Sequence, residues 1–113
     1  MPPMNEATQR KALGLLSLCR RAGRLTTGME ATLEKAQKGE AFLVLLAEDL
    51  SPRSAARLRQ GLPEQLPVRS LPCTMQTFST VTGKNSGILA VCDENFAGGI
   101  RAYLSDDEED LDR

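Results

Sequence analysis

The segment that decides the fold is residues 39–52, which read GEAFLVLLAEDLSP. Its apolar run from Phe42 to Ala47 has the length of a strand and stops at two carboxylates. Ser51 then supplies a helix N-cap, and Pro52 takes the first helical position, where its missing N–H costs nothing. An unbroken apolar strand that leads into a capped helix predicts a buried strand of an α/β domain.

The rest of the chain places alternating helices and strands around this segment. A second apolar run at residues 87–92 predicts a second buried strand, and shorter strands are expected at 25–27 and 68–71. Helices are expected at residues 6–21, 29–38, 52–60, 75–82 and from 94 onward. Because helices separate the strands, at least part of the sheet should be parallel. This order predicts a three-layer α/β/α sandwich around a four-stranded mixed sheet.

Capping residues mark the ends of the expected helices. The expected N-caps are Asn5, Thr74 and Asp93, and the glycines expected to end helices are Gly23, Gly39, Gly61 and Gly83. Gly98 and Gly99 lie inside the last helix, where each costs about 1 kcal/mol relative to alanine. We expect them to allow a close approach of that helix to the sheet.

Apolar positions predict which side chains are buried. On the first helix the inward face is expected to consist of Ala12, Leu15, Leu16, Cys19 and Ala22. The aromatic residues Phe42, Phe78, Phe96 and Tyr103 fit core positions better than a base-stacking platform, which needs exposed rings. Only Tyr103 is a candidate for exposure.

Composition limits the class of protein. The chain has 113 residues, 41% of them hydrophobic and 26% charged, as expected for one globular domain. The first residues lack the basic and apolar regions of a signal peptide, and no apolar run has the ~20 residues that span a bilayer, so we expect a cytoplasmic protein without membrane partners. Three scattered cysteines and no histidine predict inert, reduced thiols, no metal site, no cofactor and no triad chemistry. We therefore expect no catalytic residues and no enzyme activity.

The acidic residues are unevenly distributed. Residues 106–112 hold six of the fifteen acids, so residues 1–104 carry nine acids against thirteen bases, a balance of +4. We expect one domain at 1–104 and an acidic, disordered tail at 105–113. Alternatively, the tail mimics nucleic acid and screens a basic face of the domain.

The junction residues resemble a known family. Arg21-Ala22-Gly23-Arg24-Leu25 precedes Thr27-Gly28, Lys38-Gly39 follows, residues 45–52 read LLAEDLSP, and Gly83-Lys84 comes before the last strand. Over about residues 10–104 this order resembles the kink-turn-binding ribosomal protein superfamily, and most closely its bacterial YlxQ-type branch. The resemblance implies a non-catalytic protein that binds structured RNA, with ribosomal RNA, the ribosome and translation factors as candidate partners and no DNA.

In that family RNA binds at the start of the second helix and at the loop after the third strand, where unsatisfied N–H groups and the helix dipole attract phosphates and base edges. Carried onto this chain, and joined by nearby basic residues, the candidate RNA-binding residues are Arg21, Arg24, Gly28, Met29, Glu30, Ala31, Thr32, Glu34, Lys35, Pro72, Cys73, Thr74 and Lys84. Arg20 and the third-helix residues Arg53, Arg57 and Arg59 are further basic candidates, for which solvated surface charge is an equally good interpretation.

Several positions depart from the family's pattern. Glu30 stands at the asparagine position, Ala31 at the guanine-contacting glutamate position, and Glu34 at the lysine position. In the second loop Thr77-Phe78-Ser79 replaces the family's Glu-Leu-Gly. One base-edge contact is worth about 1–3 kcal/mol of discrimination, so these changes leave two hypotheses open. The chain either binds structured RNA or has become a protein–protein interaction module of the same fold.

Glu48 and Asp49 form the one acidic pair that could suggest catalysis, because they end a strand of an α/β sheet. No histidine or third carboxylate accompanies them in the local sequence. We favour a structural interpretation, in which Asp49 or Ser51 accepts hydrogen bonds from the first N–H groups of the third helix.

Overall fold

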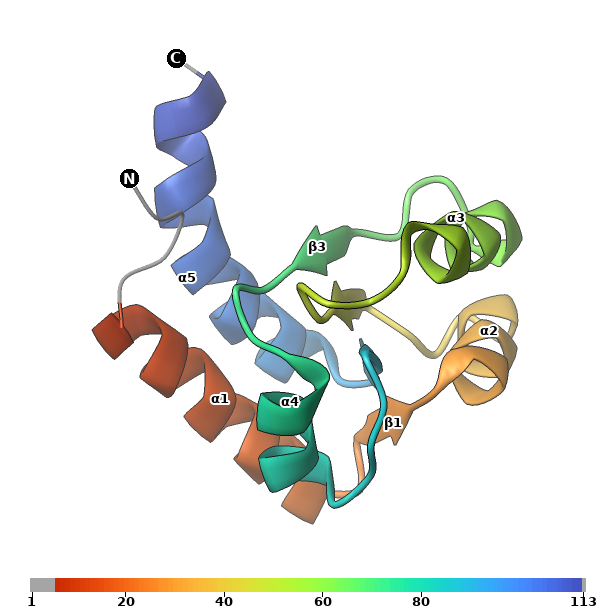
Figure 1. Cartoon of the computed structure of the whole chain (residues 1–113), viewed down its shortest axis with the longest axis horizontal. Helices are drawn as coiled ribbons and strands as arrows, with labels where there is room; N and C mark the ends of the chain where they lie inside the picture. The colour runs from red at the N-terminus through yellow and green to blue at the C-terminus, as the bar shows by residue number, and fades with distance from the viewer. Residues whose placement is uncertain (1–5, 113) are drawn as a thin grey trace.

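A computed structural model describes residues 6–112, with side chains described from residue 6 to residue 104. Helices and strands alternate along the chain (Figure 1). The elements are α1 (Glu6–Arg21), β1 (Leu25–Thr27), α2 (Met29–Gln37), β2 (Leu43–Leu46), α3 (Pro52–Gly61), β3 (Val68–Ser70), α4 (Met75–Thr82), β4 (Ile88–Val91) and α5 (Glu94–Asp112). Every helix and strand expected from the sequence is present.

The two strands with unbroken apolar sequences lie in the middle of the sheet. The strand order is β1-β4-β2-β3, with β4 antiparallel to both β1 and β2 and with β2 parallel to β3. Every residue of β2 and β4 is buried, because each strand has a neighbour on both edges and helices on both faces. The predicted mixed sheet is confirmed.

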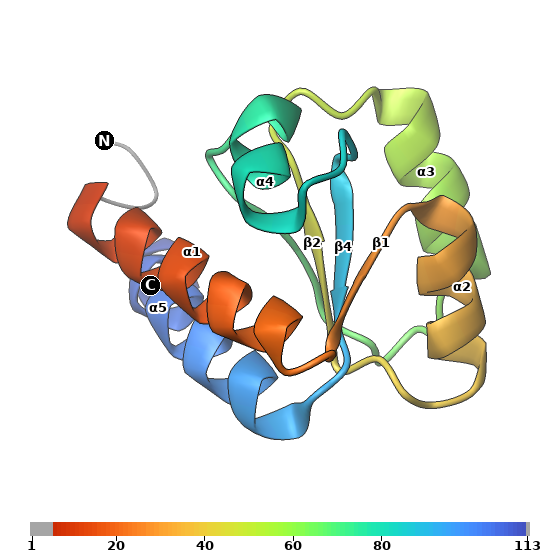
Figure 2. The ribbon, with the colours of Figure 1, turned by 90° about the horizontal axis from the view of Figure 1, so that it is seen from below.

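The helices form a layer on each face of the sheet. Figure 2 shows α1, α4 and α5 on one side of the strands and α2 and α3 on the other. Alternate residues of β2 point to opposite faces of the sheet and pack against different helix layers. Leu43 and Leu45 belong to the cluster that includes Leu16 and Phe78. Val44 packs with Leu58 on the opposite face. The expected three-layer sandwich is confirmed.

The N-caps behave as the sequence predicts where the structure describes them. Ser51 Oγ accepts from the N–H of Ser54 at 3.1 Å, and Thr74 Oγ1 accepts from that of Thr77 at 3.2 Å. Asp93 Oδ1 accepts from the N–H of Phe96 at 3.0 Å. The N-cap expected at Asn5 lies outside the described residues.

Two burial predictions and one packing prediction are wrong. Phe42 is 37% exposed, because it precedes Leu43, the first residue of the fully buried strand β2, and so lies at the end of the sheet. Ala22 is exposed because α1 ends at Arg21. Gly99 approaches α1 rather than the sheet: a Cβ at this position would lie 3.3 Å from Leu15 Cδ1, so its missing side chain accommodates the packing of α5 on α1.

The last helix is assigned through the sequence where we expected the acidic tail. α5 runs from Glu94 to Asp112 without a break at residue 104, and the division into a domain and a disordered tail stays a prediction. Within the described range, no helix is both long enough and apolar enough to cross a membrane.

Candidate nucleic-acid interface

One end of the sheet collects the segments that the sequence singled out. β1, β2 and β3 run in one direction and β4 in the other, so the segments that follow β1, β2 and β3 lie at the same end of the sheet as the segment that precedes β4. These segments are residues 28, 47–51, 71–74 and 83–87. Hydrogen bonds join them: Gly28 N–H donates to the Ile88 carbonyl at 3.0 Å, and Ala47 N–H donates to the Gly87 carbonyl at 2.9 Å. We call this surface the α2 end of the sheet.

The start of α2 is open on this surface. Gly28 is its N-cap at φ 96° and ψ 160°, a conformation that side chains with a Cβ rarely adopt, and it makes no side-chain cap. A Cβ there would find no atom within 4 Å, so the space beside the helix start is empty of protein. The first N–H groups of α2 therefore lack a side-chain acceptor, and the positive end of the helix dipole faces outward.

The packing below this opening involves a residue that the sequence analysis did not single out. A Cβ at Gly87 would lie 3.0 Å from Met75 Cγ and 3.2 Å from Leu50 Cδ1, so three loops meet at this glycine. The sequence does show a glycine directly before the apolar strand β4, but Met75 and Leu50 are 12 and 37 residues away from it in sequence. Only the folded chain brings Leu50 and Met75 together.

Asp49 has a structural role, but on a different helix from the one expected. Its Oδ1 accepts from the N–H of Met75 at 2.9 Å, which is the first residue of α4. Ser51 alone caps α3 by its side chain. Asp49 thus stabilises the start of α4 and joins the β2–α3 loop to it.

Two of the candidate RNA-binding side chains are buried. The Thr32 side chain is fully buried in α2, and its Oγ1 has no hydrogen-bond partner among the described residues. Cys73 is 2% exposed within the core cluster, and its carbonyl accepts from the N–H of Glu48 at 2.8 Å. Neither side chain reaches a ligand at the surface. Their neighbours Pro72 and Thr74 are half-buried, and the Thr74 hydroxyl is already engaged as an N-cap.

The thiols match the expectation of inert cysteines at two of three positions. Burial raises the pKa of Cys19 from 9.0 to about 11, assisted by Cys92 and Asp93, and burial also raises the pKa of Cys73. Both stay protonated near neutral pH. Cys92 is half-buried, and its sulfur lies 3.7 Å from Thr26 Oγ1. Among residues 6–104, no three His, Cys, Asp or Glu side chains are placed to hold a metal ion.

The basic candidates are divided between the two ends of the sheet. Lys84 is exposed on the loop that returns to the α2 end, whereas Arg24 lies at the far end of β1, where its carbonyl accepts from the N–H of Cys92 at 2.8 Å. Gly28 lies four residue steps beyond Arg24 along this extended segment, or about 13 Å. Lys35 lies in the last turn of α2 and pairs with Glu40 at 3.3 Å. The structure therefore does not bring Arg24 and Lys35 to the start of α2.

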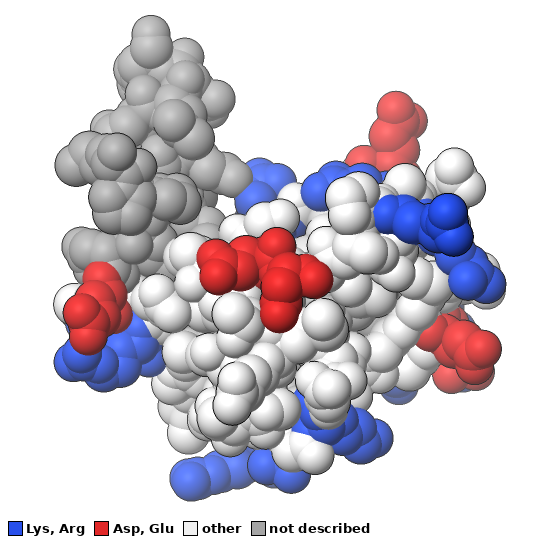
Figure 3. All heavy atoms as spheres, viewed as in Figure 1, with Lys and Arg blue, Asp and Glu red and all other residues white. Residues whose placement is uncertain are grey.

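The end of α1 supplies further positive charge. Arg20 and Arg21 are exposed in its last turn, and Arg20 Nη2 lies 3.4 Å from where a Cβ of Gly83 would be. Figure 3 shows basic side chains along the lower rim of this face, beneath α4 and the end of α1, and acidic side chains nearer its middle. Any anionic ligand at the α2 end therefore meets both signs of charge.

Carboxylates occupy positions close to the opening. Glu30 is exposed in the first turn of α2, and Glu48 is exposed in the β2–α3 loop. Glu34 points to solvent one turn further along α2 and lies 3.9 Å from Lys38 Nζ. Ala31 and Met29 are half-buried and offer apolar contact beside these charges.

Comparisons with known proteins agree with this architecture. No family model matches the chain. The chain is 29% identical over 99 residues to the RNA-binding protein YlxQ of Enterococcus faecium, covering 83% of this chain and 91% of that protein. The resemblance to YlxQ-type proteins predicted from the sequence is confirmed by this similarity.

Two solved structures share the fold. A protein with unknown function from Bacillus halodurans superposes with a TM-score of 0.76 at 29% identity, covering 84% of this chain and 97% of that one. The 15.5kD RNA binding protein of Giardia lamblia superposes with a TM-score of 0.74 at 16% identity, covering 96% and 94%. The second similarity concerns the fold alone, because the identity is low.

Proposed function

We propose that this chain, which resembles the YlxQ-type proteins, is a non-catalytic cytoplasmic protein that binds structured RNA at the α2 end of its sheet. The observation that carries the proposal is the open start of α2, where Gly28 provides neither a side-chain cap nor a Cβ. The name of the Enterococcus faecium relative, an RNA-binding protein, supports RNA as the ligand.

The chemistry of the helix start suits an RNA backbone or base edge. The first N–H groups of α2 donate to phosphate or base oxygens, and the helix dipole stabilises the negative charge. The absence of a Cβ at Gly28 allows the ligand's backbone to approach these donors directly. Lys84 and Arg20 add positive charge from the neighbouring loop and from α1.

The side chains around the opening predict weak discrimination among RNAs. Ala31 provides no acceptor for a guanine, and Glu34 provides negative charge at the position where the family has a lysine. Contacts from backbone N–H groups and basic side chains remain, and these position RNA without reading its sequence. We therefore expect binding that depends on RNA shape and salt more than on the G·A pairs of a kink-turn.

Fluorescence anisotropy tests this function with a blunt-ended kink-turn RNA and a matched RNA whose G·A pairs are destroyed. Each is titrated at two salt concentrations with wild type, Lys84→Glu and Arg24→Glu. We expect both RNAs to bind. We expect Lys84→Glu to weaken binding and to make the slope of log K against log salt shallower, by an amount that corresponds to the loss of about 1 to 2 phosphate contacts. Arg24→Glu has the same charge change at the far end of β1 and should have little effect.

The outcomes separate the parts of the proposal. No binding by the wild-type chain at either salt concentration would refute RNA binding. Equal loss in the two charge variants would refute the α2 end as the surface while leaving RNA as a ligand. Co-sedimentation with purified ribosomal subunits tests the association with translation, and the Lys84→Glu variant should sediment less.

A protein–protein interaction module of the same fold is the second candidate. The observation that favours it is the exposed carboxylates Glu30 and Glu48 beside the open helix start. Under this function the chain would bind a protein partner from cell extract after nuclease treatment, and Glu30→Lys would abolish that capture. RNA binding that Glu30→Lys strengthens would favour the first function instead.

A further inference from the structure

The opposite end of the sheet carries an exposed aromatic ring. Phe42 is 37% exposed, and with Leu18 it is one of two large hydrophobic side chains exposed among the described residues. Its N–H donates to the Val91 carbonyl at 2.9 Å, and the adjoining strand β2 has a neighbouring strand on each side. A peptide therefore cannot add here as a further strand, and the ring itself is what this position offers to a ligand.

Two connected hollows border Phe42, and a third adjoins the second of them. A hollow of about 290 Å³ between Arg24, Lys35 and Cys92 shares Phe42 and Gly39 with a second hollow of about 240 Å³. The second is bounded by Pro63, Leu66 and Pro67, which it shares with a third hollow of about 520 Å³ that extends to Arg59 and Arg69. The middle hollow is smaller than the ~300–1,000 Å³ of typical small-molecule sites.

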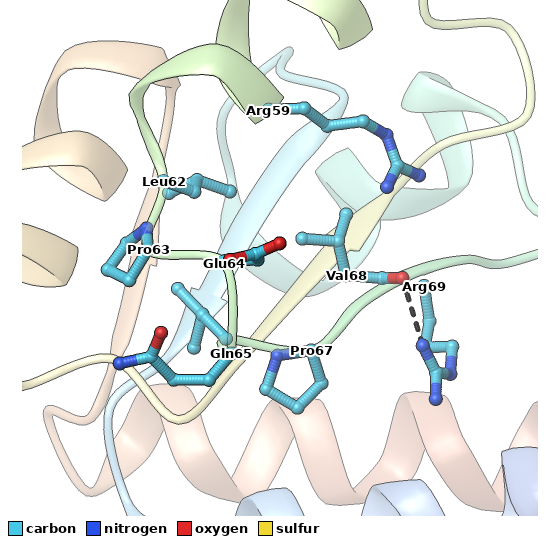
Figure 4. Close-up of a pocket in the computed structure, with 9 residues that line it drawn as sticks. Arg59, Leu62, Pro63, Glu64, Gln65, Pro67, Val68 and Arg69 are labelled. Carbon is cyan, nitrogen blue, oxygen red and sulfur yellow. Dashed lines mark hydrogen bonds between the residues drawn. The ribbon is translucent and has the colours of Figure 1, made fainter.

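Basic side chains line the outer two of these three hollows. Arg24 is exposed on one side and makes no ion pair with any residue of the described range. On the other side, Figure 4 shows Arg59 and Arg69 on either side of Val68, with Arg69 Nη1 donating to the Val68 carbonyl at 3.3 Å. The hollows together are lined by four basic residues, Arg24, Lys35, Arg59 and Arg69, and by two acidic ones, Glu40 and Glu64.

We propose that this end of the sheet is a second nucleic-acid surface, which binds single-stranded RNA by stacking one base on Phe42. The adjacent phosphates lie toward Arg24 and Lys35 on one side and toward Arg59 on the other. An exposed aromatic ring next to a groove with basic side chains is the combination by which proteins hold single strands without reading their sequence. Pro63 and Pro67 add apolar surface to the lining of the middle hollow.

This inference goes beyond the proposed function, because it uses the end of the sheet opposite the start of α2. Arg24 and Gly28 terminate opposite ends of β1, so one RNA segment does not contact both sites through the same nucleotide. An RNA with a structured part and a single-stranded extension would engage the two surfaces together, which would raise its affinity through a high effective concentration.

A tryptophan probe tests the second surface directly. The chain contains no tryptophan, so Phe42→Trp places a unique fluorophore at the proposed stacking position. We expect titration with hexauridylate or hexaadenylate at low salt to quench its emission, as stacking of a base on the indole does. Leu18→Trp is the matched control, because Leu18 is also exposed but lines none of the three hollows.

Two further variants measure the contributions of the ring and the charge. With a fluorescein-labelled hexauridylate, Phe42→Ala should weaken binding by about 5- to 100-fold, the range for loss of one stacked base. Arg24→Gln should lower the slope of log K against log salt by about 0.7, the value for one phosphate contact on a single strand. Circular dichroism melting should show both variants folded, because both side chains are exposed.

Equal quenching of the Phe42 and Leu18 probes, or none at either, would overturn the inference. So would quenching by an acidic leucine-containing peptide with none by the oligonucleotides, which would assign this end of the sheet to a protein partner. Binding of the blunt kink-turn RNA by Phe42→Ala at wild-type affinity is expected in every case. That readout separates failure of this surface from failure of the α2 end.

Discussion

Replacement of Gly28 by alanine tests the geometry on which the proposed RNA site depends. Gly28 has φ 96° and ψ 160°, which places it in a region of conformational space that is essentially restricted to glycine. An added Cβ would meet no atom within 4 Å. The substitution therefore introduces backbone strain without any steric clash or any new packing.

The expected cost follows from this isolation. A residue with a Cβ in this region costs about 1–3 kcal/mol, and alanine is also a poorer N-cap than glycine. The added Cβ also lowers the conformational entropy of the unfolded chain, which stabilises the folded state by about 0.4–1 kcal/mol. We expect Gly28→Ala to lower the free energy of unfolding by about 1–2 kcal/mol.

Gly98→Ala is the matched control, because it adds the same methyl group in α5. Gly98 is exposed, its Cβ would also meet no atom within 4 Å, and its φ is not positive. Here alanine should raise the free energy of unfolding by about 1 kcal/mol, the difference in helix propensity. Urea unfolding followed by circular dichroism measures both, and the two variants should differ by about 2–3 kcal/mol.

A common sign for the two variants would refute this reasoning. In particular, a Gly28→Ala protein as stable as wild type would mean that the β1–α2 junction adopts an ordinary conformation. The open helix start would then not depend on this glycine. If Gly28→Ala is destabilised as expected but folded, its affinity for the blunt kink-turn RNA should also fall, because the junction orients the α2 N–H groups.

Four further experiments test the surrounding structure. Asp49→Ala should lower the free energy of unfolding by about 0.5–2 kcal/mol, because the N–H of Met75 loses its acceptor, and Asp49→Asn should recover most of this in the same urea assay. Thr32→Val should raise the free energy of unfolding by about 1 kcal/mol without changing RNA affinity, because it removes a buried hydroxyl that has no hydrogen-bond partner among the described residues. A lower free energy of unfolding would instead show that the hydroxyl makes a hydrogen bond. Cys92 should react with a thiol reagent at pH 8 well before Cys19, because Cys19 is fully buried. The pKa of Cys19 is raised to about 11 in the folded chain, so folding disfavours its thiolate. The contribution of the protonated thiol to the free energy of unfolding should therefore be complete below pH 9 and lost between about pH 9 and 11. Cys19→Ala should lessen this decline.

Local sequence signals were sufficient for the elements and most of their ends. The apolar runs that form β2 and β4 identify buried strands, because a strand covered on both faces has a short, continuous run of apolar residues. Ser51, Thr74 and Asp93 cap the helices that follow them, since such hydrogen bonds reach only three residues along the chain.

The errors concern contacts between residues that are distant in sequence. The sequence leaves open whether Asp49 or Ser51 accepts from the first N–H groups of α3. Ser51 does so, whereas the fold places the Asp49 carboxylate against the N–H of Met75, 26 residues later. Phe42 was assigned to the core because it continues an apolar run, and its exposure depends on which helices reach the end of the sheet. Arg24 was grouped with Gly28 because they are four residues apart, although an extended strand between them directs them to opposite ends.

The sequence by itself determined the order of helices and strands and the resemblance to YlxQ-type proteins, because these depend on short-range periodicity, capping and junction residues. Only the tertiary structure decided which residues share a surface. The antiparallel pairing of β4 with β1 and β2 brings Gly28, Gly87 and Lys84 to one end of the sheet and leaves Phe42 and Arg24 at the other. The physical reason is that strand direction and neighbour choice are set by packing of whole layers, which no local stretch of the chain encodes.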